Sequence, residues 1–232
     1  MQNAIITGAS RGVGEATAVE LARLGYRLYL SARNEDGLQA LKSRLEVQFG
    51  VEIVIHSVDF SKRSEVIDYA AWLSNNLESV DVLVNNLGMY RPDSLLEMTE
   101  LDEQMEVNFY STFALTQRLL PFFTEQKAGH IFNMLSIRVN QPWDQAVSYS
   151  ISKHAFEGYH KLLQQTLRPL GVKVTGIYPA SINTSSWDGE EGVPREEFIQ
   201  PEDIAGLIST AVQSQHGTVV SDIHLDSINP NF

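Results

Sequence analysis

The chain has 232 residues and a formal net charge of −12, from 29 acidic and 17 basic residues, and it contains no cysteine. Nucleic-acid binding requires a basic face that neutralises phosphates, so this charge balance predicts no nucleic-acid partner. The same charge disfavours docking on anionic membranes, and no apolar run approaches the roughly 20 residues of a membrane span. Disulfides and thiolate metal sites are excluded because cysteine is absent.

The composition and the first residues favour an ordinary cytoplasmic protein. Hydrophobic residues make up 43% and charged residues 20%, which is typical of a folded domain. Met1 is followed directly by an apolar, strand-like segment, without the basic flank and long apolar core of a secretory signal. We therefore expect a cytoplasmic location.

Strand-like and helix-like segments alternate along the whole chain. Short apolar runs bounded by glycine or polar residues predict strands, and apolar residues at helical spacing predict helices. Ser61 is interpreted as a helix N-cap, Pro121 as a kink and Pro201 as the first residue of the last helix. In chain order the predicted elements are strand 3–7, helix 14–24, strand 27–31, helix 36–49, strand 52–58, helix 61–77, strand 80–84, helix 102–127, strand 130–135, helix 146–170, strand 173–178, a helix from residue 201, and an edge strand at 223–225.

This alternation predicts a single α/β domain over residues 1–232. Its core would be a doubly wound, Rossmann-type parallel sheet with helices on both faces. Such sheets bind ligands beyond the carboxyl ends of their strands, where the strand order reverses. The irregular segment 179–200 follows one of these ends, so we predict that it is a short substrate loop.

A glycine-rich turn, TGASRGVG at residues 7–14, connects the first strand to the first helix. Gly8 permits a tight turn, while Gly12 and Gly14 allow a pyrophosphate to approach the backbone. The unpaired N–H groups at a helix N-terminus attract phosphate. The turn therefore predicts a nucleotide site.

A second pattern, Tyr-x-x-x-Lys, lies at Tyr149 and Lys153. Residues four apart share one helix face, so the phenol and the ammonium can converge. A nearby cation favours the phenolate and lowers the tyrosine pKa from its usual value near 10. Ser136 follows the fifth strand 13 residues before Tyr149, and Asn108 lies a further 28 residues upstream, inside a predicted helix.

The glycine spacing, the Tyr-x-x-x-Lys pair and their companions resemble the classical short-chain dehydrogenase/reductase family from Thr7 to about Ile204. The resemblance implies that Tyr149 is the acid in carbonyl reduction and the base in alcohol oxidation. Lys153 would lower the Tyr149 pKa and bind the nicotinamide ribose, and Ser136 would hydrogen-bond the substrate oxygen. Asn108 would hold a water that passes protons to Lys153.

The resemblance also implies a set of dinucleotide contacts. Asp59 would bind the adenine amino group, Asn86 and Gly88 would pack by their backbone against the adenosine ribose, and Ile182 and Thr184 would hold the carboxamide. The expected cofactor-binding residues are Gly8, Ser10, Arg11, Gly12, Val13, Gly14, Arg33, Asp59, Phe60, Asn86, Gly88, Tyr149, Lys153, Pro179, Ile182 and Thr184.

The second strand indicates NADP(H) as the cofactor. An NAD-selective site carries an acid at the end of this strand, which here ends Leu30-Ser31-Ala32-Arg33. Arg33 and Arg11 could bind a 2′-phosphate with their guanidinium groups. The alternative is that Arg33 is solvated and Glu35 binds the ribose.

The predicted activity is hydride transfer that interconverts a carbonyl and a secondary alcohol, with a small-molecule substrate. One alternative is a 3-oxoacyl reductase acting on an acyl-carrier-protein or CoA thioester, and another is a non-catalytic dinucleotide sensor. The first is weakened by the acidic charge, since acyl carrier proteins are acidic too, and by a C-terminus that lacks a Gly-Gly ending. The intact tyrosine and lysine pair argues against the second.

Further features concern the pocket and the assembly. Leu87, Ala180 and Arg138 depart from the family pattern, and Arg138 could meet an anionic substrate or be a surface residue. Trp143 and Trp187 could line the substrate pocket or anchor loops. The histidines lack metal-ligand spacing, so no metal is expected. By the same resemblance, helices 102–127 and 146–170 would pair between subunits of a homotetramer or a dimer.

Overall fold

The sheet has seven parallel strands in the order β3-β2-β1-β4-β5-β6-β7 in the computed structural model, which describes residues 2–189 and 192–229. Residues 190 and 191 of the predicted substrate loop lie outside the described residues. The strands are β1 (Asn3–Thr7), β2 (Arg27–Ala32), β3 (Ile53–Ser57), β4 (Val82–Asn85), β5 (His130–Met134), β6 (Lys173–Pro179) and β7 (Asp222–Leu225). The doubly wound α/β prediction is confirmed, including the edge strand.

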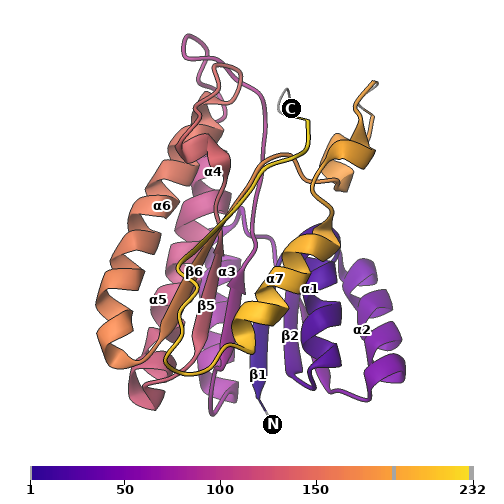
Figure 1. Ribbon diagram of the computed structural model, residues 1–232, viewed down its shortest axis with the longest axis vertical. Helices are drawn as coiled ribbons and strands as arrows, with labels where there is room; N and C mark the ends of the chain where they lie inside the picture. The colour runs from indigo at the N-terminus through magenta and orange to yellow at the C-terminus, as the bar shows by residue number, and fades with distance from the viewer. Residues whose placement is uncertain (1, 190–191, 230–232) are drawn as a thin grey trace.

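Helices cover both faces of the sheet (Figure 1). One face carries α1, α2 and α7, and the other carries α3, α5 and α6, each group enclosing its own hydrophobic core. The helices are α1 (Gly12–Arg23), α2 (Glu35–Phe49), α3 (Arg63–Asn76), α4 (Leu101–Met105), α5 (Ser111–Gln126), α6 (Val147–Leu167) and α7 (Pro201–Val212). Because β1, β4 and β5 are covered on both sides, all their residues are buried.

Local sequence signals explain several helix ends. Asn34 caps α2 by accepting a hydrogen bond from the Gly37 backbone N–H at 3.1 Å, and Gly50 ends the helix with φ of 67°. The interpretation of Ser61 as an N-cap is wrong, because α3 begins with Lys62 as its cap. The Ser61 hydroxyl instead donates to Asp59 Oδ1 at 2.7 Å.

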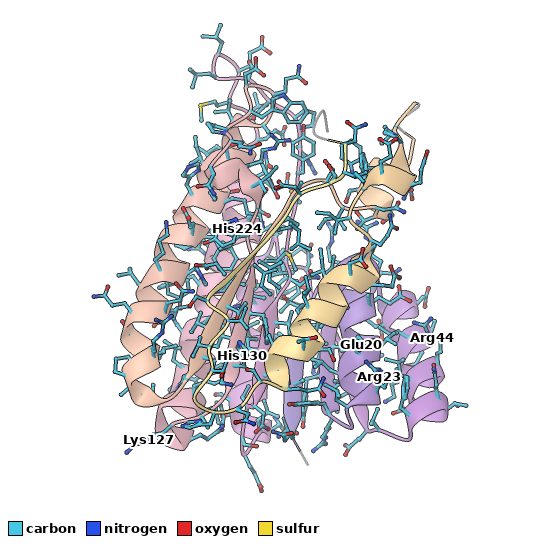
Figure 2. The ribbon with its side chains drawn as sticks, viewed as in Figure 1. Glu20, Arg23, Arg44, Lys127, His130 and His224 are labelled. Carbon is cyan, nitrogen blue, oxygen red and sulfur yellow. The ribbon has the colours of Figure 1, made fainter. Side chains whose placement is uncertain are left out.

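Exposed ion pairs lie on the outer surface of α1 and α2. Arg23 pairs with Glu20 along α1 (Figure 2). Arg44 of α2 pairs with Glu15 of α1 at 2.7 Å. Pairs of this kind contribute about 0–1 kcal/mol, because water and salt screen them. The two hydrophobic cores, and not these surface charges, therefore hold the helices on the sheet.

The predicted helix 102–127 is interrupted by a π-helical turn. α4 passes at Glu106 into a π-turn that ends at Tyr110, and α5 then continues through Pro121. A π-turn inserts one extra residue into the helical repeat and therefore changes the direction of the side chains it carries. Asn108 lies at the middle of this turn, so its orientation differs from that of a residue in a regular helix.

The strand order reverses between β1 and β4. These strands are direct neighbours, with Ile5 opposite Leu83, although three helices and two strands separate them in sequence. The chain leaves the ends of β1 and β4 in opposite lateral directions, toward α1 and toward the segment before α4. A crevice is expected beyond Thr7 and Asn85 at such a point.

Candidate active site

A cleft of about 780 Å³ lies beyond the carboxyl ends of the central strands. It contains the glycine-rich turn at one side and Ser136, Tyr149 and Lys153 at the other. Of the residues predicted to form the site, these line the cleft: Gly8, Ser10, Arg11, Gly12, Val13, Arg33, Asp59, Phe60, Asn86, Gly88, Ser136, Tyr149, Lys153, Pro179, Ile182 and Thr184. Gly14 and Asn108 are absent from the lining, and both are buried.

The glycine turn is built for close approach of the backbone. Gly8 has φ of 65° and Gly12 of 58°, a left-handed region that side chains disfavour. A Cβ at Gly14 would lie 2.3 Å from the Gly8 carbonyl oxygen and 2.7 Å from Asn86 Nδ2. The absence of a side chain at Gly14 therefore allows α1 to start directly against the turn.

Asn86 fixes this turn to the end of β4. Its backbone N–H donates to Thr7 Oγ1 at 3.0 Å, and its side-chain Nδ2 donates to the carbonyls of Thr7 and Gly8 at 3.2 and 3.3 Å. The sequence prediction gave Asn86 a backbone role against the ribose. Its amide in fact spans the two strands at the switch point and holds the glycine turn in place.

The turn fits the diphosphate of a dinucleotide. α1 begins after Arg11, whose backbone is extended, and no side chain caps its first N–H groups. Gly8 and Gly12 present bare backbone to the cleft, so an anion can reach the helix N-terminus. The same edge holds Arg11 and Arg33, both exposed, which adds positive charge on the adenosine side.

Asp59 lies at the same end of the cleft as a fixed anion. Its Oδ1 accepts from the Ser61 N–H at 3.1 Å and from the Ser61 hydroxyl, and these bonds hold the pKa of the Asp59 carboxyl below its usual range. Arg33 and Lys62 favour the charged form as well. Glu35, the alternative ribose ligand, does not line the cleft.

Ser136, Tyr149 and Lys153 converge from β5 and α6. Tyr149 and Lys153 occupy one face of α6, with Lys153 Nζ 5.7 Å from the centroid of the Tyr149 ring. Ser136 follows β5, and its hydroxyl accepts from the Arg138 backbone N–H at 3.2 Å. Lys153 is 2% exposed, and its ammonium donates to the Met134 carbonyl at 2.9 Å.

The pKa of Tyr149 differs from the sequence expectation. Burial raises it above the usual value, while the hydrogen bond to Ser136 and the charge of Arg138 lower it to a smaller extent. The net direction is therefore the opposite of the lowering expected from the sequence, because burial outweighs the other effects. Burial disfavours both charged forms, and it also lowers the pKa of Lys153 to about 8.

The side-chain amide of Asn108 makes hydrogen bonds to protein groups through both its oxygen and its nitrogen. Its Oδ1 accepts from the Met89 N–H at 2.7 Å, and its Nδ2 donates to the Met89 carbonyl and to Ser152 Oγ, both at 2.9 Å. Over residues 2–189 and 192–229 no bond from Asn108 to Lys153 is recorded. Asn108 joins the π-turn to the loop after β4 and to α6, and its water-holding role stays a prediction.

Sequence reasoning missed the loop after β4 as part of the site. Tyr90 lines the cleft and meets the Tyr149 ring edge-on, with centroids 5.6 Å apart. Asp93 accepts hydrogen bonds from the N–H and the hydroxyl of Ser148, next to Tyr149 at the start of α6. These contacts join residues more than 50 positions apart, and no local pattern reveals them.

The two tryptophans have different places. Trp143 lies parallel to Tyr90, a residue of the cleft lining, with ring centroids 6.5 Å apart. Trp187 packs on Phe198, and its indole N–H donates to the Ile182 carbonyl at 3.1 Å. Neither lines the cleft directly, and Trp187 anchors the loop that follows β6.

The described part of the chain has neither a metal-binding cluster nor a membrane-spanning helix. No group of three or more histidine, aspartate or glutamate residues is arranged to hold a metal ion within residues 2–189 and 192–229. Over the same residues, no helix has the length and apolar character needed to cross a membrane.

Comparison with known proteins places this geometry among related chains. Residues 2–191 match the family model for short chain dehydrogenases. The chain is 29% identical over 230 residues to sepiapterin reductase from Chlorobaculum tepidum, covering 95% of this chain and 94% of that protein. It is 33% identical over 221 residues to an uncharacterised short-chain type dehydrogenase/reductase of Sinorhizobium fredii, covering 90% and 85%.

Solved structures agree in fold. An alcohol dehydrogenase from Thermococcus sibiricus, complexed with 5-hydroxy-NADP, superposes with a TM-score of 0.89 at 28% identity over 98% of this chain and 97% of that chain. A metagenomic short-chain oxidoreductase in complex with NADP gives 0.84 at 28% identity over the same shares.

Proposed function

The chain belongs to the short-chain dehydrogenase/reductase family, and on that premise we propose that it interconverts a carbonyl and a secondary alcohol with NADP(H), using Tyr149 as the acid and base. The observation that carries the proposal is the single cleft shared by the glycine turn, Ser136, Tyr149 and Lys153. Relatives at 28% identity that hold NADP or its 5-hydroxy derivative support the cofactor.

Each residue has a role that follows from its position. NADPH, when bound, supplies the hydride. Ser136 donates a hydrogen bond to the carbonyl oxygen and orients it toward the Tyr149 hydroxyl, which gives its proton to that oxygen. Because burial raises its pKa, Tyr149 keeps its proton at neutral pH and is ready to act as the acid in reduction.

Lys153 completes the proton path and the ribose site. Its ammonium is buried beside Tyr149, so it stabilises the phenolate that forms when the proton leaves. In the reverse direction the same charge helps Tyr149 to accept a proton from an alcohol. Lys153 also offers N–H donors to ribose hydroxyls at the cleft wall.

The adenosine end supports NADP(H) over NAD(H). β2 ends at Ala32 without an acid, and both Arg33, which follows it, and Arg11 line the cleft. Two guanidinium groups can bind a 2′-phosphate with charge-assisted hydrogen bonds. Asp59, Asn86, Gly88, Ile182 and Thr184 keep the adenine, ribose and carboxamide roles proposed from the family resemblance.

An NADPH oxidation assay tests the proposal. Purified protein is mixed with NADPH and a panel of ketones, aldehydes and 3-oxoacyl thioesters, and absorbance at the nicotinamide band is followed. Consumption that requires a carbonyl supports the proposal, and a strong preference for thioesters selects the 3-oxoacyl reductase alternative. Tight NADPH binding with no turnover of any carbonyl or alcohol contradicts it and favours a dinucleotide sensor.

Surface features support the expected homo-oligomer, and its location in the cytoplasm stays a prediction from the sequence. Half-exposed apolar side chains lie on the π-turn and the two long helices, namely Tyr110, Phe113, Ile151 and Leu162. Apolar surface of this kind marks interfaces between subunits. Light scattering at micromolar concentration distinguishes a tetramer or dimer from a monomer, and a monomeric mass contradicts this assignment.

A further inference from the structure

Arg138 departs from the family pattern and lies two residues after Ser136. The short helical turn Ile137–Val139 begins at Ser136, and the Arg138 N–H donates to the Ser136 hydroxyl at 3.2 Å. The backbone of Arg138 is thus hydrogen-bonded to the Ser136 hydroxyl, the group that would hold the substrate oxygen. The Arg138 side chain is half-buried and is not itself part of the cleft lining, which Ser136, Tyr149 and Tyr90 form on this side.

An aromatic row holds the Arg138 guanidinium. Its central carbon lies 5.0 Å from the centroid of the Trp143 ring. Trp143 lies parallel to Tyr90, and Tyr90 meets the Tyr149 ring edge-on at 5.6 Å. Stacking on an aromatic ring fixes the plane of a guanidinium but leaves the N–H groups at its edge able to donate.

No carboxylate neutralises this guanidinium within the described ranges. Its recorded side-chain bond is from Nη1 to the Gln141 carbonyl at 3.5 Å, and no ion pair involves it there. Arg91, a cation that lines the cleft, differs because Glu100 and Glu103 pair with it at 3.3 and 3.0 Å. Arg138 therefore presents an uncompensated positive charge in a protein whose net charge is −12.

The charge of Arg138 reaches the reaction centre. Burial raises the pKa of Tyr149, and the charge of Arg138, after the hydrogen bond to Ser136, acts in the opposite direction. An anionic substituent on the substrate, close to a carbonyl that contacts Ser136 and Tyr149, would be within the same range of Arg138. A planar carboxylate matches the fork of a guanidinium in two parallel hydrogen bonds.

We propose that Arg138 is a specificity-determining residue that binds a carboxylate on the substrate, so that the preferred substrates are oxo acids or the matching hydroxy acids. This inference rests on the proposed function, because it names the class of carbonyl compound that the same site accepts.

The test compares an acid with its neutral ester. Two pairs are used, phenylglyoxylate with its methyl ester and 4-oxopentanoate with its methyl ester, which place the carboxylate next to the carbonyl or two methylenes away. The quantity measured is the ratio of kcat/KM for the acid to kcat/KM for the ester with NADPH. A change in the Tyr149 pKa affects both members alike, so the ratio isolates the contact with the carboxylate.

For one of the pairs the ratio is expected to fall about 10-fold to 100-fold in Arg138→Gln, the range of a charge-assisted hydrogen bond. Arg138→Lys keeps the charge and loses the fork, so its ratio should fall by a smaller factor. Arg118→Gln is the matched control, since Arg118 lies on α5, donates to Ser74 Oγ at 3.0 Å and is not among the charges that act on Tyr149.

Two results would overturn the inference in distinguishable ways. The first result is that the esters are reduced and that, for both pairs, the acid-to-ester ratio of kcat/KM is the same in wild type and in the folded Arg138 variants. This result overturns the carboxylate site alone. No reduction of any of these compounds, or of any member of the carbonyl panel, removes the proposed function together with the inference.

Discussion

Replacing Gly14 with alanine tests whether the start of α1 must pack against the glycine turn. The added Cβ would lie 2.3 Å from the Gly8 carbonyl oxygen, where ordinary contact needs 3.4 Å or more, so the backbone must move by about 1 Å. Overpacking of this kind costs about 1–3 kcal/mol, against a gain of up to about 1 kcal/mol in helix propensity. We expect a net loss of about 1–2 kcal/mol in the free energy of unfolding.

The matched control is Gly206→Ala in α7, where no atom lies within 4 Å of the new Cβ. This variant should gain about 0.5–1 kcal/mol, since alanine favours a helix interior over glycine. Urea unfolding followed by circular dichroism measures both changes. Because Gly8 lines the cleft, Gly14→Ala should also lower kcat/KM by about 10²-fold. Equal stability gains in the two variants, with unchanged NADPH binding, would refute the packing argument.

Further predictions concern the reacting groups and the cofactor. Tyr149→Phe should lower kcat about 10²-fold to 10⁴-fold while NADPH affinity, measured by fluorescence titration, is kept; near-normal turnover would exclude Tyr149 as the acid. Changing Arg11 and Arg33 together to alanine should weaken NADPH binding about 10²-fold and leave NADH binding little altered, and equal NADH and NADPH affinities in the wild type would contradict the assignment. The pKa of Lys153 is about 8 in the folded protein, below its usual value near 10.4. Between these two pH values the unfolded chain therefore keeps a proton on Lys153 that the folded chain has lost. Wild type should therefore gain stability relative to Lys153→Met as pH rises from about 8 to 10, by at most about 1.4 kcal/mol per unit, and parallel pH curves from urea unfolding would contradict the shift.

The sheet and the cleft could be predicted from the sequence because the patterns that indicate them are local. Apolar runs predicted the strands, and parallel strands bring their carboxyl ends to one edge, so residues after β1, β4, β5 and β6 meet there. Tyr149 and Lys153 share a face because they are four residues apart in a helix. The doubly wound fold and the family assignment follow from these signals and are confirmed.

Features that depend on tertiary contacts could not be predicted from the sequence. The π-turn at Asn108 interrupts a continuous helical pattern, and the amide there is held by Met89 on a distant loop. Ser61 has the residue type of a cap, but Asp59 competes for its hydroxyl. The pKa of Tyr149 rises because burial outweighs its charged neighbours, and burial depends on packing of the whole cleft.

Transfer of deuterium from NADPH to the product tests the central claim most directly. NADPH labelled with deuterium at both C4 positions is incubated with the protein and the best carbonyl of the panel, and the alcohol is analysed by mass spectrometry. The account predicts one deuterium on the former carbonyl carbon with wild type, and strongly reduced formation of this product with Tyr149→Phe. An unlabelled alcohol, or equal labelled product from both proteins, would contradict hydride transfer with Tyr149 as the acid.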